Sequence, residues 1–526
     1  MDVEIILVLL FVVVLLVALA NKLKLPYPIL LVLAGLIISF VPAFPDVILK
    51  PELVFILFLP PIIQLSAFYT SARDFRANIR SISLLAVGLV LATMVAVALV
   101  AHALIKDLPW GAAFALGAIV GPTDSIAATS IAQRLGLPRR IVTVLEGESL
   151  LNDATALVAY RVAVAAVVTG TFSLLDAGGQ FLLSSIGGIG LGIVLGLIVT
   201  PIFRRLNEDV PVYLTLTFLS GYGAYLLADA LHFSGVLAVA TIGIFYGQPR
   251  FNTMTPTLRI QGTAIWDIVV FVLNGLIFIL VGLQLNDIVK QLPDGTSMEV
   301  VWYAILISLT LIVVRFIWVF AGTYLPRLPA SVRARDPFPH WQHVVIVSWA
   351  GMRGGVSLAT ALALPFVLDN KAVFPQRSLI IFLTFCVILA TLVLQGLTLP
   401  FLIKRLNVVD DGTSEREEHK ARLKAAQAAQ AQLTIIAQEL DLSSAHMGKL
   451  MHHYEDRIRH YTALYHGELD ADGEDHFAQF GKIEQQLLKA ELDAVLQLRN
   501  DQVINDEILR RVQYDLDLEW LRLQDN

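Results

Sequence analysis

Residues 147–154 read Gly147-Glu148-Ser149-Leu150-Leu151-Asn152-Asp153-Ala154 and place two carboxylates inside a long apolar stretch. The preceding apolar stretch contains a similar polar segment, Gly121-Pro122-Thr123-Asp124-Ser125. A carboxylate in the middle of a bilayer costs about 2.5 to 3.5 kcal/mol on insertion scales, so such residues usually mark an ion or proton pathway. The two segments therefore predict a membrane protein that moves ions.

The overall composition agrees with a membrane protein. Hydrophobic residues make up 56% of the chain, charged residues make up only 16%, and the mean hydropathy is +0.71. Soluble domains carry about 25% charged residues. Apolar runs of about twenty residues, the length of a spanning helix, predict an all-α polytopic protein with about thirteen transmembrane helices. The runs centre near residues 11, 35, 60, 92, 121, 155, 192, 220, 240, 276, 312, 353 and 390.

The distribution of lysine and arginine predicts the orientation of these spans, because cytoplasmic loops carry an excess of both. With the N-terminus outside, one set of loops holds seventeen of these residues and the other set holds five. The seventeen are Lys22, Lys24, Arg73, Arg76, Arg80, Arg134, Arg139, Arg140, Arg204, Arg205, Arg250, Arg259, Arg327, Arg333, Arg335, Lys404 and Arg405. The five are Lys50, Lys106, Lys290, Lys371 and Arg377. This asymmetry predicts a multi-pass protein of the plasma (inner) membrane with a cytoplasmic C-terminal tail.

The C-terminal tail differs in composition from the rest of the chain. Residues 413–526 carry 13 lysines and arginines against 22 aspartates and glutamates, a net charge of −9, whereas the preceding residues carry 25 against 22. Apolar residues at helical spacing, such as Ile483, Leu487 and Leu492, predict amphipathic helices that pack on each other or on a partner subunit. We therefore predict a transmembrane domain over residues 1–412 and a helical regulatory or dimerisation tail over residues 413–526. Seven of the eleven histidines lie in this tail, where they either sense pH or simply occupy polar helix faces.

Two interrupted spans predict internal symmetry. The fifth span contains Gly117, Gly121 and Pro122, and the twelfth, seven spans later, contains Gly351-Met352-Arg353-Gly354-Gly355. Because seven is odd, the two spans cross the membrane in opposite directions, as expected of inverted repeats whose broken helices bind ions near the midplane. Asp124 and Arg353 can supply charge to the broken ends, and a purely structural role fits Arg353 equally well.

The sixth span carries the candidate ion site. Ser149, Asn152 and Asp153 lie three and four positions apart, so we expect them on one face of the helix. Their hydroxyl, amide and carboxylate oxygens are the hard ligands that an alkali cation prefers. Glu148 lies one position round the helix, and Arg315 on the eleventh span is the best candidate to neutralise it. This leaves Asp153 to titrate, unless its carboxylate is only hydrogen-bonded into a helix junction.

The physical mechanism needs one carboxylate for which a cation and a proton compete. Because Asn152 cannot titrate, the residues predict one cation per proton and therefore electroneutral exchange. A cation channel is an alternative, but the sequence contains no recognisable selectivity filter. An intramembrane aspartyl protease could use Asp124 and Asp153 as a dyad, but no Gly-x-Gly-Asp segment surrounds either residue. We expect no enzymatic activity, no cofactor and no nucleic-acid partner.

The motifs resemble those of the monovalent cation/proton antiporter family. The similarity is to the sodium/proton exchanger branch with an Asn-Asp pair on the sixth helix, and within it to long bacterial forms with a cytoplasmic tail. The matching segments are Leu59-Pro60-Pro61, Thr123-Asp124, Gly147 to Ala154, Phe271-Val272-Leu273-Asn274-Gly275-Leu276-Ile277-Phe278, Trp349-Ala350-Gly351-Met352-Arg353-Gly354-Gly355-Val356-Ser357 and Gln395-Gly396-Leu397-Thr398-Leu399-Pro400.

The resemblance implies secondary antiport of a monovalent cation, Na⁺ first and K⁺ or Li⁺ as alternatives, for H⁺ by alternating access in pH homeostasis. It implies that Asp153 binds the cation or carries the proton, helped by Ser149 and the backbone of Thr123. It also implies that Asp124 supports the crossing of unwound helices. Glu148 and Arg315 would form a structural ion pair. Family members are commonly homodimers in which a core bundle moves against a dimerisation scaffold.

This chain departs from the family pattern at two places. Ser125 replaces a proline that often follows the Thr-Asp pair, and its hydroxyl can soften the helix break. The segment Ile62-Ile63-Gln64-Leu65-Ser66 lacks the acid that many members carry after the Pro-Pro of the third span. A role for that acid in holding the ion does not carry over to this chain, which leaves the ion selectivity open.

Overall fold

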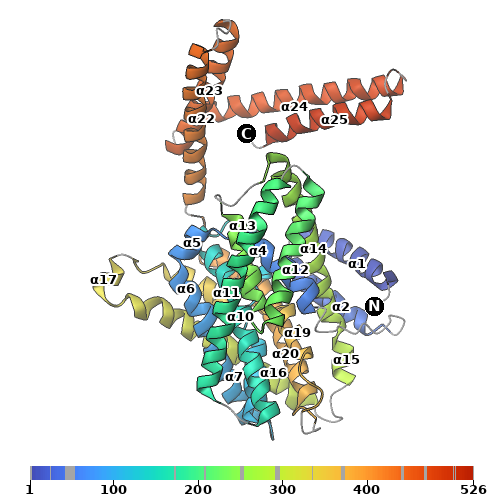
Figure 1. The fold of residues 1–526 in the computed structure, drawn as a ribbon, viewed down its shortest axis with the longest axis vertical. Helices are drawn as coiled ribbons and strands as arrows, with labels where there is room; N and C mark the ends of the chain where they lie inside the picture. Colours follow the sequence, from blue (N-terminus) through green and yellow to red (C-terminus); the bar gives the residue numbers. More distant parts are fainter. Residues whose placement is uncertain are drawn as a thin grey trace. The chain divides into compact units, whose positions relative to one another are not determined.

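The computed structural model describes residues 3–23, 25–41, 54–170, 173–206, 209–248, 254–290, 297–334, 336–368, 373–410, 412–439, 444–466, 471–501, 503 and 505–524. The chain divides into two compact units, Met1–Asp410 and Asp411–Asn526 (Figure 1). Some of the basic residues used to predict orientation lie outside the described residues. They are Lys24, Lys50, Arg250, Arg335 and Lys371.

The first unit is helical. Among the described residues, eight helices are long and apolar enough to cross a membrane, and four shorter apolar helices accompany them. The predicted class of an all-α polytopic membrane protein is therefore confirmed, whereas the number of thirteen spans stays a prediction. The helices are α1 (Val3–Leu23), α2 (Tyr27–Ser39), η1 (Val54–Phe58), α4 (Leu59–Tyr69), α5 (Ala72–Ala77), α6 (Ile79–Ser83), η2 (Leu84–Leu89), α7 (Val90–Leu104), α8 (Trp110–Val120), α9 (Ser125–Arg134), α10 (Arg139–Thr169), α11 (Leu174–Arg205), α12 (Val210–Ala230), α13 (Gly235–Gly247), α14 (Pro256–Leu283), α15 (Leu285–Lys290), α16 (Ser297–Tyr324), η3 (Leu325–Arg327), α17 (Ala330–Arg333), α18 (Trp341–Trp349), α19 (Gly355–Leu362), α20 (Arg377–Ala390), η4 (Thr391–Gln395) and α21 (Gly396–Arg405).

Both interrupted spans are broken where the glycines and proline predict. The fifth span consists of α8 and α9, separated by residues 121–124, and the twelfth consists of α18 and α19, separated by residues 350–354. Pro122 favours an end to α8 because it has no backbone N–H to donate to a carbonyl of the preceding turn. The unwound segments meet, since the Asp124 backbone N–H donates a hydrogen bond to the Met352 carbonyl oxygen at 2.8 Å. The prediction of two crossed interrupted helices is confirmed.

Apolar side chains of the first unit form two main buried clusters. The larger gathers residues of α1, α2, α7 to α10, α14, α16 and α18 to α20. The smaller is built on α4, α11, α12 and α13, with Leu150 and Ala154 of α10 and Trp266 of α14. Because α10 and α14 contribute to both clusters, they mark the boundary between two packed bodies.

Among its described residues, the second unit has four helices. They are α22 (Thr413–Glu439), α23 (Ser444–His466), α24 (Ala471–Asn500) and α25 (Asp506–Gln524). Helix α22 packs on α23, and α24 packs on α25 (Figure 1). Tyr461 and Leu488 are buried, whereas Ile483 and Leu487 are 53% and 60% exposed. The predicted helices are present, but Ile483 and Leu487, which were predicted to pack, are exposed on this unit. A role of the helices in regulation or dimerisation stays a prediction.

Candidate functional site

A cavity of about 90 Å³ lies beside the crossing of the two broken helices. Thr123, Asp124, Ser149 and Asp153, all named from the sequence, line it together. The remaining lining residues come from α4, α9, α10, α14, α19 and the adjoining unwound segments: Leu59, Ile62, Ile63, Ser66, Pro122, Ile126, Leu150, Asn274, Ile277, Gly354, Gly355, Val356 and Ser357. The cavity thus combines hydroxyl, carboxylate and amide groups with freed backbone, which are suitable ligands for a small cation.

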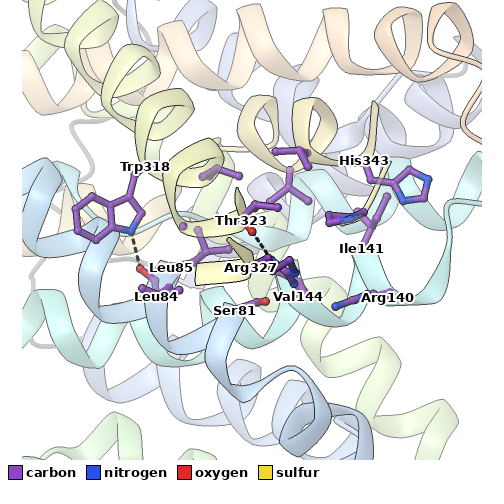
Figure 2. Close-up of a pocket in the computed structure, with 15 residues that line it drawn as sticks. Ser81, Leu84, Leu85, Arg140, Ile141, Val144, Trp318, Thr323, Arg327 and His343 are labelled. Carbon is purple, nitrogen blue, oxygen red and sulfur yellow. Dashed lines mark hydrogen bonds between the residues drawn. The ribbon is translucent and has the colours of Figure 1, made fainter. Parts of the chain in front are cut away.

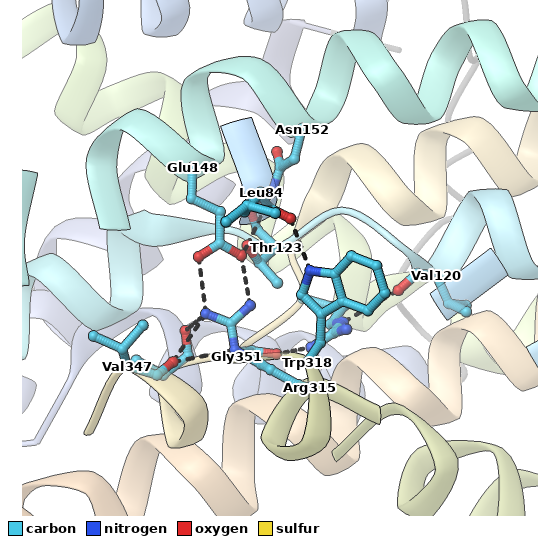
Figure 3. Close-up of polar contacts among 11 residues, drawn as sticks. Leu84, Val120, Thr123, Glu148, Asn152, Arg315, Trp318, Val347 and Gly351 are labelled. Atoms are coloured by element: carbon cyan, nitrogen blue, oxygen red, sulfur yellow. Dashed lines mark hydrogen bonds and ion pairs between the residues drawn. The ribbon is translucent and has the colours of Figure 1, made fainter. Parts of the chain in front are cut away.

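Glu148 and Arg315 form an ion pair next to this cavity (Figure 3). Arg315 Nη1 lies 2.5 Å from Glu148 Oε1, and Arg315 Nη2 lies 2.9 Å from Glu148 Oε2. The two side chains are 0% and 2% exposed. Arg315 also donates to the Val347 carbonyl at 3.0 Å and to the Ala350 carbonyl at 3.4 Å. The guanidinium therefore joins α10 and α16 to the negative end of the half-helix α18.

Thr123 connects this ion pair to the unwound segment of the fifth span. Its hydroxyl donates to Glu148 Oε1 at 2.9 Å, and Asn152 Nδ2 donates to the Thr123 hydroxyl at 2.9 Å and to its carbonyl at 3.1 Å. Asn152 lies outside the cavity lining in the described part of the chain. Asn152 and Glu148 both contact Thr123, whereas Ser149 and Asp153 line the cavity. The single face expected for Ser149, Asn152 and Asp153 is thus divided into two rows.

Asp124 lies where the positive ends of helix dipoles meet. Its Oδ1 accepts a hydrogen bond from the Ile126 backbone N–H at 2.8 Å, in the first turn of α9. Gly354, which precedes α19, leaves room for the carboxylate, since a Cβ there would lie 2.6 Å from Asp124 Cγ. Helix N-termini stabilise negative charge. The Asp124 carboxylate is therefore suited to support two half-helices at once.

Arg353 has the complementary position at a negative helix end. It is 1% exposed, its Nε donates to the Val120 carbonyl at 3.1 Å, and its Nη1 donates to the Gly351 carbonyl. Val120 is the last residue of α8, so the guanidinium caps carbonyl oxygens that the break leaves without helical partners. These contacts favour the structural interpretation of Arg353.

Three polar residues of the cavity, Ser66, Asn274 and Ser357, lie in segments quoted from the sequence but were not predicted as site residues. Asn274 is 5% exposed, and its Oδ1 has no hydrogen-bond partner among the described residues. An amide within the apolar run 269–283 is the signal that could have identified it. Gln64 donates to the Thr217 carbonyl at 2.9 Å and lies outside the cavity lining of the described chain. The side chain of Ser125 lies outside the described residues.

Residues 7–405 match the family "Sodium/hydrogen exchanger, transmembrane". The chain belongs to the sodium/hydrogen exchanger family. An uncharacterized Na(+)/H(+) exchanger of Mycobacterium bovis is 36% identical over 513 residues, 96% of this chain and 93% of the relative. A sodium, potassium, lithium and rubidium/H(+) antiporter of Bacillus pumilus is 36% identical over 393 residues, 72% of this chain and 58% of the relative. The structure of the sodium proton antiporter MjNhaP1 from Methanocaldococcus jannaschii at pH 8 is similar with a TM-score of 0.60 at 20% identity, covering 76% of this chain and 97% of that chain.

The family membership confirms the resemblance found in the motifs, and the structural similarity confirms the fold. The chain is therefore a multi-pass membrane protein of a family of transporters. The family contains transporters rather than hydrolases, so the aspartyl protease alternative for Asp124 and Asp153 loses its support.

Proposed function

We propose that this exchanger carries a monovalent cation across the plasma membrane in exchange for H⁺, with Asp153 as the residue that binds both in turn. Na⁺ is the first candidate, and K⁺ and Li⁺ are the alternatives. The observation that carries the proposal is the cavity at the helix crossing, where Asp153, Ser149, Asp124 and Thr123 come together in a member of the exchanger family. We assign the cation ligands to Asp153, Ser149 and the Thr123 backbone.

The charges around the cavity support Asp153 as the titrating residue. Glu148 is neutralised by the two guanidinium contacts of Arg315. The Asp124 carboxylate accepts a backbone hydrogen bond at the start of α9, where the helix dipole favours its ionised form. Asn152 donates to Thr123 and has no proton to exchange at physiological pH. One titrating acid carries one proton or one monovalent cation, so the exchange is electroneutral with a ratio of 1:1.

The position of the cavity between the two hydrophobic clusters supports alternating access. Ile277 belongs to the larger cluster and Ile63 to the smaller, and both line the cavity. We assign the moving body to the larger cluster and the scaffold, which would also form a homodimer, to the smaller. A loaded Asp153 carries no net charge across the barrier, whereas an empty carboxylate is costly to move through a medium of low dielectric constant. This difference couples the two fluxes.

The names of the relatives support a site that accepts more than one alkali cation. The relative from Bacillus pumilus is named for sodium, potassium, lithium and rubidium. Hydroxyl, carboxylate and backbone oxygens bind hard cations, and the cavity of this chain offers all three. We therefore expect transport of Na⁺ together with slower transport of K⁺ or Li⁺.

Proton flux in proteoliposomes tests this function. The purified full chain is reconstituted with an internal pH dye, and Na⁺, K⁺ or Li⁺ is added outside in turn while the membrane potential is clamped at different values. We expect cation-dependent alkalinisation of an acid-loaded lumen at a rate that does not change with the potential. Cation flux that follows the potential and moves no protons would instead support a channel.

A further inference from the structure

A second cavity of about 90 Å³ lies among α6, η2, α10, α16, η3 and α18 (Figure 2). It shares no lining residue with the cavity at Asp153. Its polar part contains the basic side chains Arg140, Arg327 and His343 together with the hydroxyl groups of Ser81 and Thr323. Its other wall is apolar and includes Leu84, Leu85, Val144, Trp318, Val319 and Val347.

The cationic part is built on a buried arginine. Arg327 is 5% exposed, donates from Nη1 to the Thr323 carbonyl at 2.6 Å and pairs through Nη2 with Asp336 at 2.6 Å. Its Nε has no hydrogen-bond partner among the described residues. A buried donor without an acceptor is unfavourable, so Arg327 keeps hydrogen-bonding capacity beyond its contacts with Thr323 and Asp336.

The charges at this cavity leave an excess of positive charge. Arg140 pairs with the same Asp336 at 3.1 Å, so one carboxylate faces two guanidinium groups. The net charge of Arg140, Arg327 and Asp336 together is +1. His343, a further basic side chain, lines the same cavity. A ligand with one negative charge would complete the electrostatic balance.

The apolar wall restricts the kind of anion that fits. The Trp318 indole N–H donates to the Leu84 carbonyl at 2.9 Å (Figure 2), which satisfies the one polar group of the ring and leaves the rest as apolar surface. A cationic group beside an aliphatic and aromatic wall suits a molecule with an anionic head and a hydrocarbon chain. A hydrated inorganic anion gains nothing from such a wall.

The position of the cavity matches the depth of a lipid headgroup. Arg140 lies at the start of α10 and Arg327 follows the end of α16, on the side of the membrane that the lysine and arginine distribution predicts to be cytoplasmic. Basic pockets between transmembrane helices on that side bind anionic headgroups. We propose that this cavity binds an anionic phospholipid, with its phosphate at Arg140 and Arg327 and an acyl chain against the apolar wall.

Occupancy of this cavity would hold together the helices that carry the buried ion pair. Val347 lines the cavity, and its carbonyl accepts hydrogen bonds from Arg315. On α10, Val144 lines the cavity one helical turn before Glu148. A ligand that binds the folded state alone raises thermal stability, so the bound lipid should stabilise the first unit.

Thermal unfolding in detergent with added lipid tests the proposal. The purified full chain is delipidated and titrated with phosphatidylglycerol, with phosphatidylcholine of the same acyl chains, or with inorganic phosphate. We expect phosphatidylglycerol to raise the melting temperature of the wild type by several degrees, and the other two to have little effect. Arg140→Gln should weaken phosphatidylglycerol binding about tenfold, the effect of one charge-assisted hydrogen bond. Asp336→Asn, which removes the competing carboxylate, should strengthen it.

Two further variants separate an effect on lipid binding from a general loss of protein stability. Arg139→Gln is the matched control, because Arg139 is 53% exposed, pairs with Asp74 at 2.7 Å and does not line the cavity. Gly322→Leu fills the cavity without a change of charge, since a Cβ at Gly322 meets Leu84 only at 3.8 Å, and it should abolish the lipid-induced shift. Equal shifts in the wild type, Arg140→Gln and Gly322→Leu would overturn the proposal. A shift reproduced in full by inorganic phosphate would identify a free-anion site instead.

Discussion

At the scale of single residues, the stability of variants at Glu148 and Arg315 tests the electrostatics of the site. Because both side chains are buried, replacing either by glutamine leaves a lone charge and should cost about 3–5 kcal/mol of stability. Glu148→Gln combined with Arg315→Gln removes both charges and should cost less than the sum of the single changes. Thermal unfolding of the four purified proteins in one detergent measures this coupling.

A charge swap at the same pair gives a stricter test. Arg315 also donates to the carbonyls of Val347 and Ala350, so a glutamate at position 315 would face carbonyl oxygens and be repelled. We therefore expect the swap of Glu148→Arg with Arg315→Glu to restore less stability than the neutral double variant. Strictly additive effects of the single changes would mean that the two residues do not interact.

The site residues show what sequence spacing can and cannot predict. The need to neutralise Glu148 predicted its pairing with Arg315, because a lone charge in the membrane is too costly. Helical spacing alone could not divide Asn152 from Ser149 and Asp153, since that division depends on how α10 is rotated toward Thr123. Asn274 was missed because its position at the cavity comes from the packing of α14.

At the scale of elements, the crossing of the broken helices depends on Gly354. A Cβ at this position would lie 2.6 Å from Asp124 Cγ and 2.7 Å from Asp124 Cβ. Gly354→Ala should therefore separate the crossing, destabilise the protein by about 1–3 kcal/mol and reduce transport strongly. Flux in proteoliposomes and thermal unfolding measure the two effects.

The matched control for this change is Gly223→Ala on α12, where a Cβ meets no atom within 4 Å. Alanine favours a helix over glycine by about 1 kcal/mol, so the control should keep or gain stability and keep its transport. Normal transport in Gly354→Ala would show that close contact between Asp124 and Gly354 is not needed.

A second element-scale prediction concerns the connection between α17 and α18. Burial alone would raise the pKa of Asp336, but hydrogen bonds and charges from Arg140 and Arg327 outweigh it and lower the pKa below 3.8. A carboxylate with a lowered pKa in the folded state stabilises it above the unfolded pKa and loses this effect as the pH falls through the folded pKa. Asp336→Asn should therefore lower the melting temperature between pH 6 and 8.

Melting temperatures measured over a range of pH test this prediction. Melting temperatures of the wild type and Asp336→Asn should differ by a constant amount near neutral pH and converge only below about pH 4. A difference that disappears between pH 6 and 7 would assign the effect to another titratable group.

Among the elements, glycine and proline residues predicted the two helix breaks, but no residue predicted the π-helical segments. Gly and Pro interrupt helical backbone by their own geometry, so residues 121–122 and 354–355 could be read directly. The segments η1, η2 and η4 are π-helical and are mainly apolar, with Thr391 and Gln395 at the ends of η4. A π-helical turn forms where tertiary packing favours one extra residue within a helical turn. No residue type in the sequence indicates such a turn.

At the scale of the whole molecule, the C-terminal tail is predicted to regulate cation/proton exchange and to take no part in moving the ions. Residues 413–526 carry 13 basic residues against 22 acidic ones and seven of the eleven histidines, a composition typical of a segment that responds to pH and salt. Deletion after residue 412 should leave exchange intact and shift its dependence on pH or the fraction of dimer. Flux against pH and light scattering of the two purified proteins measure these changes, and identical profiles would remove the regulatory role.

Cation-dependent proton flux of Asp153→Asn in proteoliposomes tests the central role of Asp153 most directly. The substitution keeps the size of the side chain and removes its titratable proton, while the Glu148–Arg315 pair and the hydrogen bond between Asp124 and Met352 at the crossing are made by other residues. The variant should therefore fold, with a melting profile like that of the wild type, and show no proton flux with Na⁺, K⁺ or Li⁺. Proton exchange at the wild-type rate in the folded variant would contradict the assignment of Asp153 as the shared site of cation and proton.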